Sequence, residues 1–204
     1  MPTTTKVSIT ATDAVTAIVY PPARKGKLAV SIALAHGAGA NQTSPFIVRV
    51  ATDLAERGIG CLTFNFLYTE RRRRIPDRND TLELCYRKVI EAFHAGQFGS
   101  LGKGTLVIGG KSMGGRIASQ VAAAGGADIA GLVFLGYPLH PPGQPEKLRD
   151  AHLPAIKAPA ELCAIEGADH SLKVPKRAAK PQVEVDLFEL DTIEAWIRRV
   201  ALKH

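Results

Sequence analysis

The sequence has few cysteines, few aromatic residues and no long uninterrupted apolar run. Its three cysteines, Cys61, Cys85 and Cys163, are too few and too scattered for a disulfide framework, and no Cys or His pair has metal-ligand spacing. We interpret them as buried thiols of a protein in a reducing compartment. The sequence therefore predicts no metal site and no cofactor.

Signals for a membrane or for export are also lacking. No apolar segment approaches the roughly 20 residues that a membrane-spanning helix needs, and MPTTTKVSIT at the N-terminus lacks the charged-then-apolar order of a secretory signal. These absences predict a soluble, cytoplasmic protein that does not contact a membrane. With 204 residues, 46% of them apolar, the chain is long enough to bury one core, so we expect a single domain over residues 1–204.

Positive charge is in excess, with a net charge of +7 and four consecutive arginines at residues 71–74 followed by Arg78. No signature of a nucleic-acid-binding fold and no interleaved aromatic residues accompany these arginines. We therefore expect a solvated loop face and consider a nucleic-acid partner unlikely. Mild attraction of an anionic substrate is the alternative.

Apolar periodicity predicts an α/β fold, with a mostly parallel sheet covered by helices on both faces. Residues 6–22 alternate like one or two antiparallel edge strands, and nearly continuous apolar runs further on are typical of strands buried on both faces. The expected buried strands are residues 28–37, 59–66, 105–110 and 129–140, with a short fifth candidate at 161–167. The expected helices are residues 45–58, 80–96, 116–125 and 188–204, and Gly58 is expected to end the first of them.

The stretch GGKSMGG, residues 109–115, lies between an expected strand and an expected helix. Gly110 to Gly114 match G-x-S-x-G, a pattern in which a strained strand-to-helix turn lifts the serine oxygen clear of the backbone. The helix that begins beyond Ser112 directs N–H groups and a positive dipole end at a developing oxyanion. This context predicts a nucleophile elbow at Ser112 rather than a structural glycine-rich turn.

A second glycine-rich turn, HGAGA at residues 36–40, follows the first expected buried strand. Ligands gather beyond the carboxyl ends of parallel strands, so we expect this turn beside the elbow. A backbone N–H of Ala38 or Gly39, paired with that of Met113, would form an oxyanion hole. The alternative is that its glycines only serve a tight turn. His36 is expected to orient the loop rather than to titrate in catalysis.

His170, in EGADHSLK, is the best-placed general base because it follows the last candidate strand on a loop, as in hydrolases with the order Ser, acid, His. A histidine that only caps its loop is the alternative. The other histidines are less well placed, in an expected helix, at the C-terminus or beside a proline-rich loop: His94, His204, His140 and His152.

Five strings together resemble a known family: GGKSMGGR, HGAGA, GYPLHPPGQPEKLR, the HL of residues 152–153, and EGADHSLKVP. They are similar to the small α/β-hydrolase proteins described as dienelactone-hydrolase-like or KANL/Tex-like, from about Leu28 to the C-terminal helix. The resemblance implies an α/β-hydrolase fold with Ser112 as nucleophile and His170 as base, and it makes an arginine-rich loop a usual feature. Dienelactone hydrolases proper have cysteine in place of Ser112, so that activity is not carried over.

One part of the family pattern is missing. Relatives have a further strand before the histidine, and an aspartate at its end orients the base. Here only the strand-like run 161–167 lies between residue 140 and His170. We therefore expect a sheet that lacks one strand near its C-terminal edge, with the last strand displaced by about 4.8 Å, which threatens the contact between His170 and Ser112. We expect no dedicated acid; the remaining candidates are Glu166, Asp150, Asp169 and Glu161.

Two hypotheses follow for function. The first is a serine hydrolase that acts on a small ester or related acyl compound, weakened by the absence of an acid. The second is a catalytically silent α/β-hydrolase fold that serves as a binding or interaction module. Neither the substrate nor the oligomeric state can be derived from the sequence.

Overall fold

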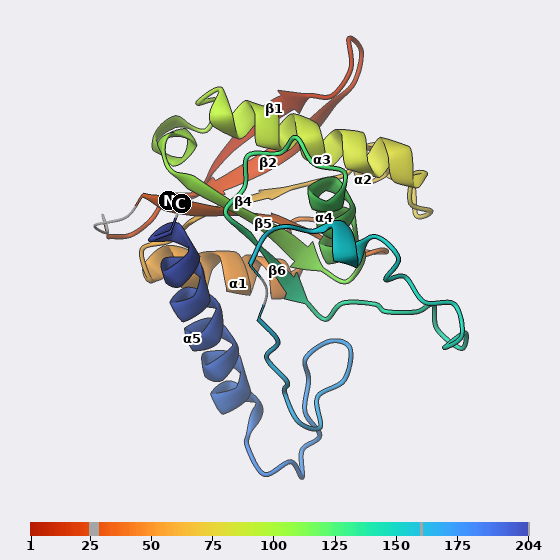
Figure 1. Ribbon diagram of the computed structural model, residues 1–204. Coiled ribbons are helices and arrows are strands. Elements are labelled where there is room, and N and C mark those ends of the chain that lie inside the picture. The colour runs from red at the N-terminus through yellow and green to blue at the C-terminus, as the bar shows by residue number, and fades with distance from the viewer. Residues whose placement is uncertain (25–28, 160, 204) are drawn as a thin grey trace.

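A six-stranded sheet forms the centre of the molecule, and helices cover both of its faces (Figure 1). The computed structural model describes residues 1–24, 29–159 and 161–203. Along the sheet the strands run β1 (Thr3–Ser8), β2 (Ala14–Tyr20), β4 (Gly60–Phe64), β3 (Val30–Ala35), β5 (Thr105–Lys111) and β6 (Gly131–Leu135). Strands β1 and β2 pair antiparallel with their neighbours, with β1 at the edge of the sheet, and the last four strands are mutually parallel. The predicted α/β class and mostly parallel sheet are confirmed.

The fold has four long helices at the places that the apolar spacing predicted, three between strands and one after the last strand. They are α1 (Pro45–Glu56), α3 (Asn79–His94), α4 (Met113–Ala123) and α5 (Gln182–Ala201). Short helical segments are α2 (Leu67–Glu70), η1 (Gly99–Lys103) and η2 (Leu153–Ala155). Gly58 follows α1 with φ of 86°, as expected for a residue that ends a helix.

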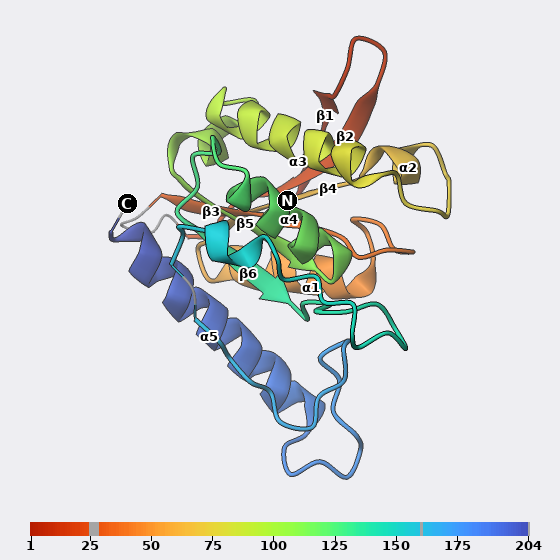
Figure 2. The same cartoon turned by 45° about the vertical axis from the view of Figure 1, so that its right-hand side comes forward.

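The sheet separates two apolar cores. Helices α3 and α4 pack on one face, and α1 and α5 pack on the other, as Figure 2 shows. All six residues of β3 are buried, because this central strand has a core on each side. The apolar face of α5 lies in the second core, with Ile193, Trp196, Ile197 and Val200.

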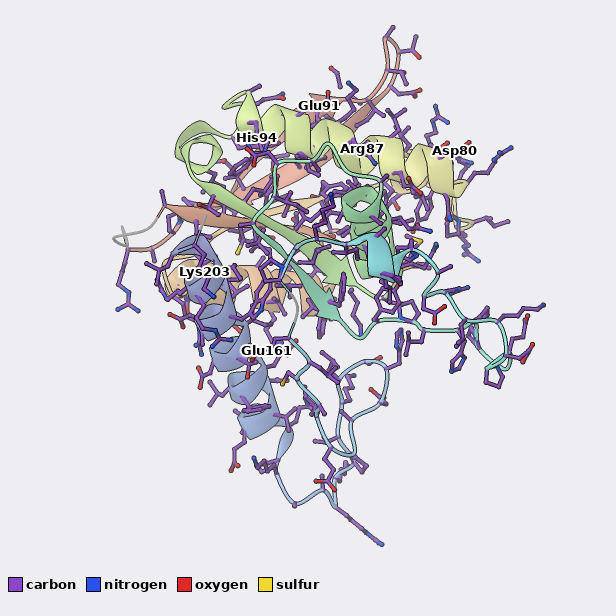
Figure 3. All side chains as sticks on the ribbon, in the orientation of Figure 1. Asp80, Arg87, Glu91, His94, Glu161 and Lys203 are labelled. Carbon is purple, nitrogen blue, oxygen red and sulfur yellow. The ribbon has the colours of Figure 1, made fainter. Side chains whose placement is uncertain are left out.

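The stretch after β6 differs from the prediction. Over residues 136–159 and 161–181 the only regular element is η2, and residues 161–167 form no strand. Glu161 instead pairs with Arg199 of α5, beside which Figure 3 shows it, and Leu162 is 91% exposed. A cavity separates this segment from β6, so its strand-like sequence finds no backbone partner. Within the described chain, β6 is therefore the edge strand on the side opposite β1. That the sheet has one strand fewer than the family pattern stays a prediction.

Two cysteines are buried as predicted, and one is not. Burial raises the pKa of Cys61 and raises that of Cys85 to about 12, so both thiols are inert at neutral pH. Cys163 is exposed, which makes its predicted burial wrong. The reason is the same as for the missing strand, because Cys163 lies in the irregular segment 161–167.

The arginine loop is exposed, as expected. Three of its arginines form ion pairs with nearby aspartates: Arg71 with Asp13, Arg73 with Asp77, and Arg78 with Asp80. In the part of the chain that the structure describes, no helix is long and apolar enough to cross a membrane. The same residues contain no group of three or more His, Cys, Asp and Glu side chains arranged to hold a metal ion.

Candidate active site

Ser112 occupies the sharp turn between β5 and α4, with φ of 51° and ψ of −113°. A residue other than glycine with positive φ has a strained backbone, typically by about 1–3 kcal/mol. Such a conformation persists only where the surrounding structure imposes it. Here the Ser112 N–H donates to the Leu135 carbonyl at 3.2 Å, and the Ser112 carbonyl accepts from Arg116 N at 3.1 Å. The turn therefore has the geometry that the glycine pattern predicted.

The glycines of the elbow are required by close backbone approach. A Cβ at Gly110 or at Gly114 would overlap the carbonyl oxygen of Ala35, the last residue of β3. A Cβ at Gly115 would lie 2.8 Å from the Gly110 carbonyl oxygen. Helix α4 can begin directly against β3 and β5 only because these side chains are absent, and this packing forces Ser112 outward.

A buried tyrosine braces the strand that leads into the elbow. The Tyr86 hydroxyl accepts from Gly109 N at 2.9 Å and lies 2.7 Å from the Gly109 carbonyl and 2.8 Å from the Ala33 carbonyl. It can donate to one of these two carbonyls at a time. Burial raises the pKa of this hydroxyl, so it stays protonated and holds β3 and β5 together just before Ser112.

The structure brings the two expected catalytic residues together. His170 Nε2 lies 2.8 Å from Ser112 Oγ, a distance at which the imidazole accepts the serine proton. Partial burial of the ring lowers the pKa of His170, and the Lys111 ammonium lowers it further. The charge of Asp169 acts in the opposite direction and raises this pKa. The expected displacement of this loop away from Ser112 does not occur, because irregular chain rather than a strand delivers His170.

Lys111 is a residue of the site that sequence reasoning missed. Its ammonium donates to the His170 carbonyl and lies 5.2 Å from the centre of the Phe46 ring. The side chain is half-buried, and burial lowers its pKa. It therefore joins the end of β5 to the loop that carries the base. The elbow pattern leaves the residue before the serine unspecified, so the sequence contained no signal for this role.

None of the candidate acids contacts the His170 ring among the residues that the structure describes. Asp169 accepts from Ser171 N at 2.7 Å and from Lys173 N at 3.0 Å, so its carboxylate closes a turn of its own loop. Glu161 pairs with Arg199. For Glu166 and Asp150 the structure shows no bond to the histidine. The orientation of His170 thus depends on its backbone contacts.

The glycine-rich turn after β3 lies against the elbow, as expected. A Cβ at Gly37 would lie 3.6 Å from Ser112 Cβ, and Gly39 has φ of 73°. His36 organises this turn: it is fully buried, its Nδ1 bonds the Gly37 carbonyl at 2.8 Å, and its Nε2 accepts from Phe66 N at 3.3 Å. Burial lowers the pKa of His36, so the ring is neutral and structural.

Three backbone amides are candidates for an oxyanion site. Within the described residues, neither Ala38 N–H nor Met113 N–H has a hydrogen-bond acceptor. Gly39 lies near the hydroxyl of Tyr68. Burial raises the pKa of this tyrosine, and the nearby Gly39 amide opposes that rise. The same hydroxyl makes no hydrogen bond of good geometry. The proximity of the Tyr68 hydroxyl to the Gly39 amide favours Ala38 over Gly39 as the oxyanion donor.

The other described histidines have structural partners. His152 Nε2 lies 2.7 Å from the buried Ser119 Oγ, whose own proton is donated to the Arg116 carbonyl. This second serine and histidine pair ties the loop after β6 to α4. His94 bonds the Asp128 carbonyl, and His140 bonds the Pro141 carbonyl. His204 lies outside the described residues.

Comparison with known proteins agrees with this architecture. Residues 29–164 match the model of the family described as alpha/beta hydrolase domain, which is more than half of the chain. The chain therefore belongs to the α/β-hydrolase family, as its sequence motifs indicated. The matched region includes the turn at Ser112 and the glycine-rich turn at residues 36–40, and it ends before His170.

Solved structures share the fold at low sequence identity. An alpha-beta serine hydrolase homologue from Coxiella burnetii has a TM-score of 0.64 at 15% identity, covering 97% of this chain and 96% of that one. Dienelactone hydrolase from Anabaena variabilis has a TM-score of 0.62 at 20% identity, covering 78% and 70%. A serine hydrolase without a lid from Xanthomonas campestris has a TM-score of 0.57 at 20% identity, covering 68% and 62%. These likenesses show the fold alone.

Proposed function

We propose that the protein is a serine hydrolase that cleaves a small ester or related acyl compound. The observation that carries this proposal is the 2.8 Å contact between Ser112 Oγ and His170 Nε2 at a turn with positive φ. A serine is a weak nucleophile until an adjacent base takes its proton, and this geometry supplies the base.

The reaction follows from the residues around Ser112. Its Oγ attacks the substrate carbonyl carbon while His170 Nε2 takes the hydroxyl proton. The amides of Met113 and Ala38 donate to the developing oxyanion. His170 then returns the proton to the leaving alcohol oxygen as the acyl C–O bond breaks. Water, deprotonated by His170, releases the acid and restores Ser112.

Among the described residues no carboxylate bonds the His170 ring, and this sets an expectation for the rate. In serine proteases, loss of the correct histidine tautomer lowers turnover by about four orders of magnitude, or roughly 5–6 kcal/mol of transition-state stabilisation. The oxyanion site and substrate binding act without the acid, so slow acylation of Ser112 is expected. We propose that Lys111 partly compensates, as a positioning residue that holds the His170 backbone against the elbow.

The test is labelling by a fluorophosphonate probe, followed by intact mass, which needs an activated serine and no knowledge of the natural substrate. We expect one adduct on the wild type and none on Ser112→Ala or His170→Ala. His140→Ala is the matched control, because His140 is exposed and bonds only within its own loop. Labelling that survives Ser112→Ala would contradict the proposal.

A catalytically silent scaffold is the second candidate, and it is favoured because no carboxylate bonds the His170 ring among the described residues. This reading predicts no adduct on folded wild-type protein, even after long incubation. A stable fold by circular dichroism together with no labelling would support it. Labelling that depends on both Ser112 and His170 would eliminate it.

A further inference from the structure

A cavity of about 460 Å³ separates the edge strand β6 from the irregular segment 161–165, and α5 lines it between them. Gly136, just after β6, belongs to its wall and lies against His170 and Lys111, so the cavity adjoins the proposed catalytic pair. Most of the lining side chains are apolar, among them Leu132, Val133, Leu153, Ile156 and Ile193.

One wall presents unpaired main-chain groups of β6. In a parallel strand, successive residues direct their N–H and C=O groups alternately to the two sides. The Leu135 carbonyl accepts from Ser112 N on the side of β5, where β6 has its only strand partner among the described residues. By alternation, Leu132 and Phe134 direct their main-chain groups to the other side, and both residues line the cavity. This side of β6 is therefore an edge that can accept a further strand.

The opposite wall runs in the same direction as β6. Its first residue, Glu161, pairs with Arg199 in the part of α5 that packs on the start of β6 (Figure 3). The chain then reaches His170, which lies just beyond the end of β6. Within the described chain, no N–H or C=O group of residues 161–164 makes a backbone hydrogen bond. Both walls of the cavity thus carry main-chain groups without backbone partners.

The two walls together indicate the kind of molecule that fits between them. An extended peptide donates and accepts on both of its sides, so it can pair with both walls at once. A small apolar molecule would leave the main-chain groups of both walls without a partner. Because the lining is mostly apolar, the side chains of such a peptide should be apolar as well.

Charge indicates which residue should stand at the end of this peptide. A Cβ on Gly136 would lie 2.8 Å from Lys111 Nζ and 3.6 Å from His170 Nδ1. The Lys111 ammonium donates to the His170 carbonyl and, in the part of the chain that is described, forms no ion pair. His170 Nδ1 likewise has no hydrogen-bond partner there, and the nearby Glu189 carboxylate is taken up by Arg49. A carboxylate at this end of the peptide would serve both nitrogens.

We propose that the cavity is the docking site for an extended segment of another protein, made of apolar residues and ending in an acidic one. The segment pairs with β6 and with residues 161–165, and its carboxylate binds Lys111 and accepts from His170 Nδ1. The contact with His170 supplies an acid that orients the base, and this part of the proposal rests on the proposed function.

Trp196, the sole tryptophan, lines the cavity and reports binding through its fluorescence. We would titrate the protein with the peptide acetyl-VVLVD-amide, with its uncharged match acetyl-VVLVN-amide, and with the acidic peptide N-methylated at its second and fourth residues. We expect saturable binding of the acidic peptide and about tenfold weaker binding of the uncharged one. The N-methylated peptide has lost two main-chain donors on one side and should bind at least about tenfold more weakly than the acidic one.

Three variants locate the binding. Lys111→Met should lose most of the preference for the acidic peptide over the uncharged one. Thr192→Phe places a larger side chain in the cavity wall on α5 and should weaken both peptides at least about tenfold. Val183→Phe is the matched control, because Val183 is an exposed residue of the same helix and does not line the cavity, so this variant should bind like the wild type.

Fluorophosphonate labelling tests the contact with His170. The acidic peptide at saturation should raise the rate of labelling at Ser112 at least about tenfold, and the uncharged peptide should raise it less. Unchanged labelling at saturation, with the dependence on Ser112 intact, would overturn this contact. No labelling at Ser112 with or without peptide would instead overturn the proposed function, and the fluorescence titration would still decide whether the peptide docks.

The docking proposal is overturned if the acidic peptide gives no saturable change, if the N-methylated peptide binds equally well, or if Thr192→Phe binds as well as the wild type. An unchanged preference in Lys111→Met would overturn the assignment of the acidic end. Light scattering that shows a dimer, which the peptide dissociates, would identify a second copy of the chain as the occupant and overturn the assignment to another protein.

Discussion

Residues 29–135 and the described part of residues 136–181 each place one member of the proposed catalytic pair, and they do so in different ways. In the first stretch strands and helices alternate, and Ser112 is held by backbone that cannot move without steric overlap. In the second, η2 is the only regular element of the described residues, and His170 is held by a few polar contacts. The proposed nucleophile is therefore fixed by packing, and the proposed base by replaceable hydrogen bonds.

This difference has an energetic meaning. Close packing resists small displacements because neighbouring atoms have no free volume. A loop held by hydrogen bonds near solvent opens locally at lower free energy than the core does. Damage to the elbow should therefore destabilise the whole domain, whereas damage to the histidine loop should alter reactivity with little effect on stability.

The largest effect is expected for Gly114→Ala. The added methyl group would overlap the Ala35 carbonyl oxygen, so we expect loss of probe labelling and a fall of about 3 kcal/mol in the free energy of unfolding by urea. Gly143→Ala, in the irregular stretch, is the control: Gly143 has φ of 71° and nothing within 4 Å of an added Cβ, so only about 1 kcal/mol of backbone strain is expected. Equal losses in both variants would break the comparison.

An intermediate effect is expected for Lys111→Met. Loss of the ammonium donor should lower the labelling rate about tenfold at unchanged fold stability. The same ammonium holds the pKa of His170 down, so its removal should also move the midpoint of the pH profile for labelling upward. Lys111→Arg, which retains the charge, should keep the midpoint low. An unchanged rate and an unchanged midpoint in Lys111→Met would show that Lys111 does not position the base.

The smallest effect is expected at the contact between α1 and α5, which attaches the C-terminal helix to the rest of the domain. Burial raises the folded-state pKa of Glu189 above its unfolded value of about 4.3. The folded state then holds this proton more tightly, so stability is greatest below the unfolded pKa and declines as pH rises through the folded pKa. Urea unfolding at several pH values should show this decline in the wild type and a flatter curve in Glu189→Gln. Parallel curves would contradict the assignment.

Much of the first stretch was predictable because its elements are locally encoded. Continuous apolar runs predicted β3, β4, β5 and β6, and helical spacing predicted the long helices. The glycine pattern around Ser112 predicted the elbow, since few local structures other than a tight backbone turn require so many small residues together. The predicted strand at 161–167 was wrong because strand formation needs a partner edge, which periodicity does not supply.

The sequence by itself determined the class of fold, the strained turn at Ser112 and the presence of a histidine near the end of the sheet, because each depends on local backbone preference or on apolar spacing. The tertiary structure decided that His170 reaches Ser112, that Lys111 holds its loop, and that Glu189 of α5 pairs with Arg49 of α1. Those features depend on contacts between residues far apart in the chain, such as Ser112 with His170 and Arg49 with Glu189, and no local pattern specifies which distant side chains will meet.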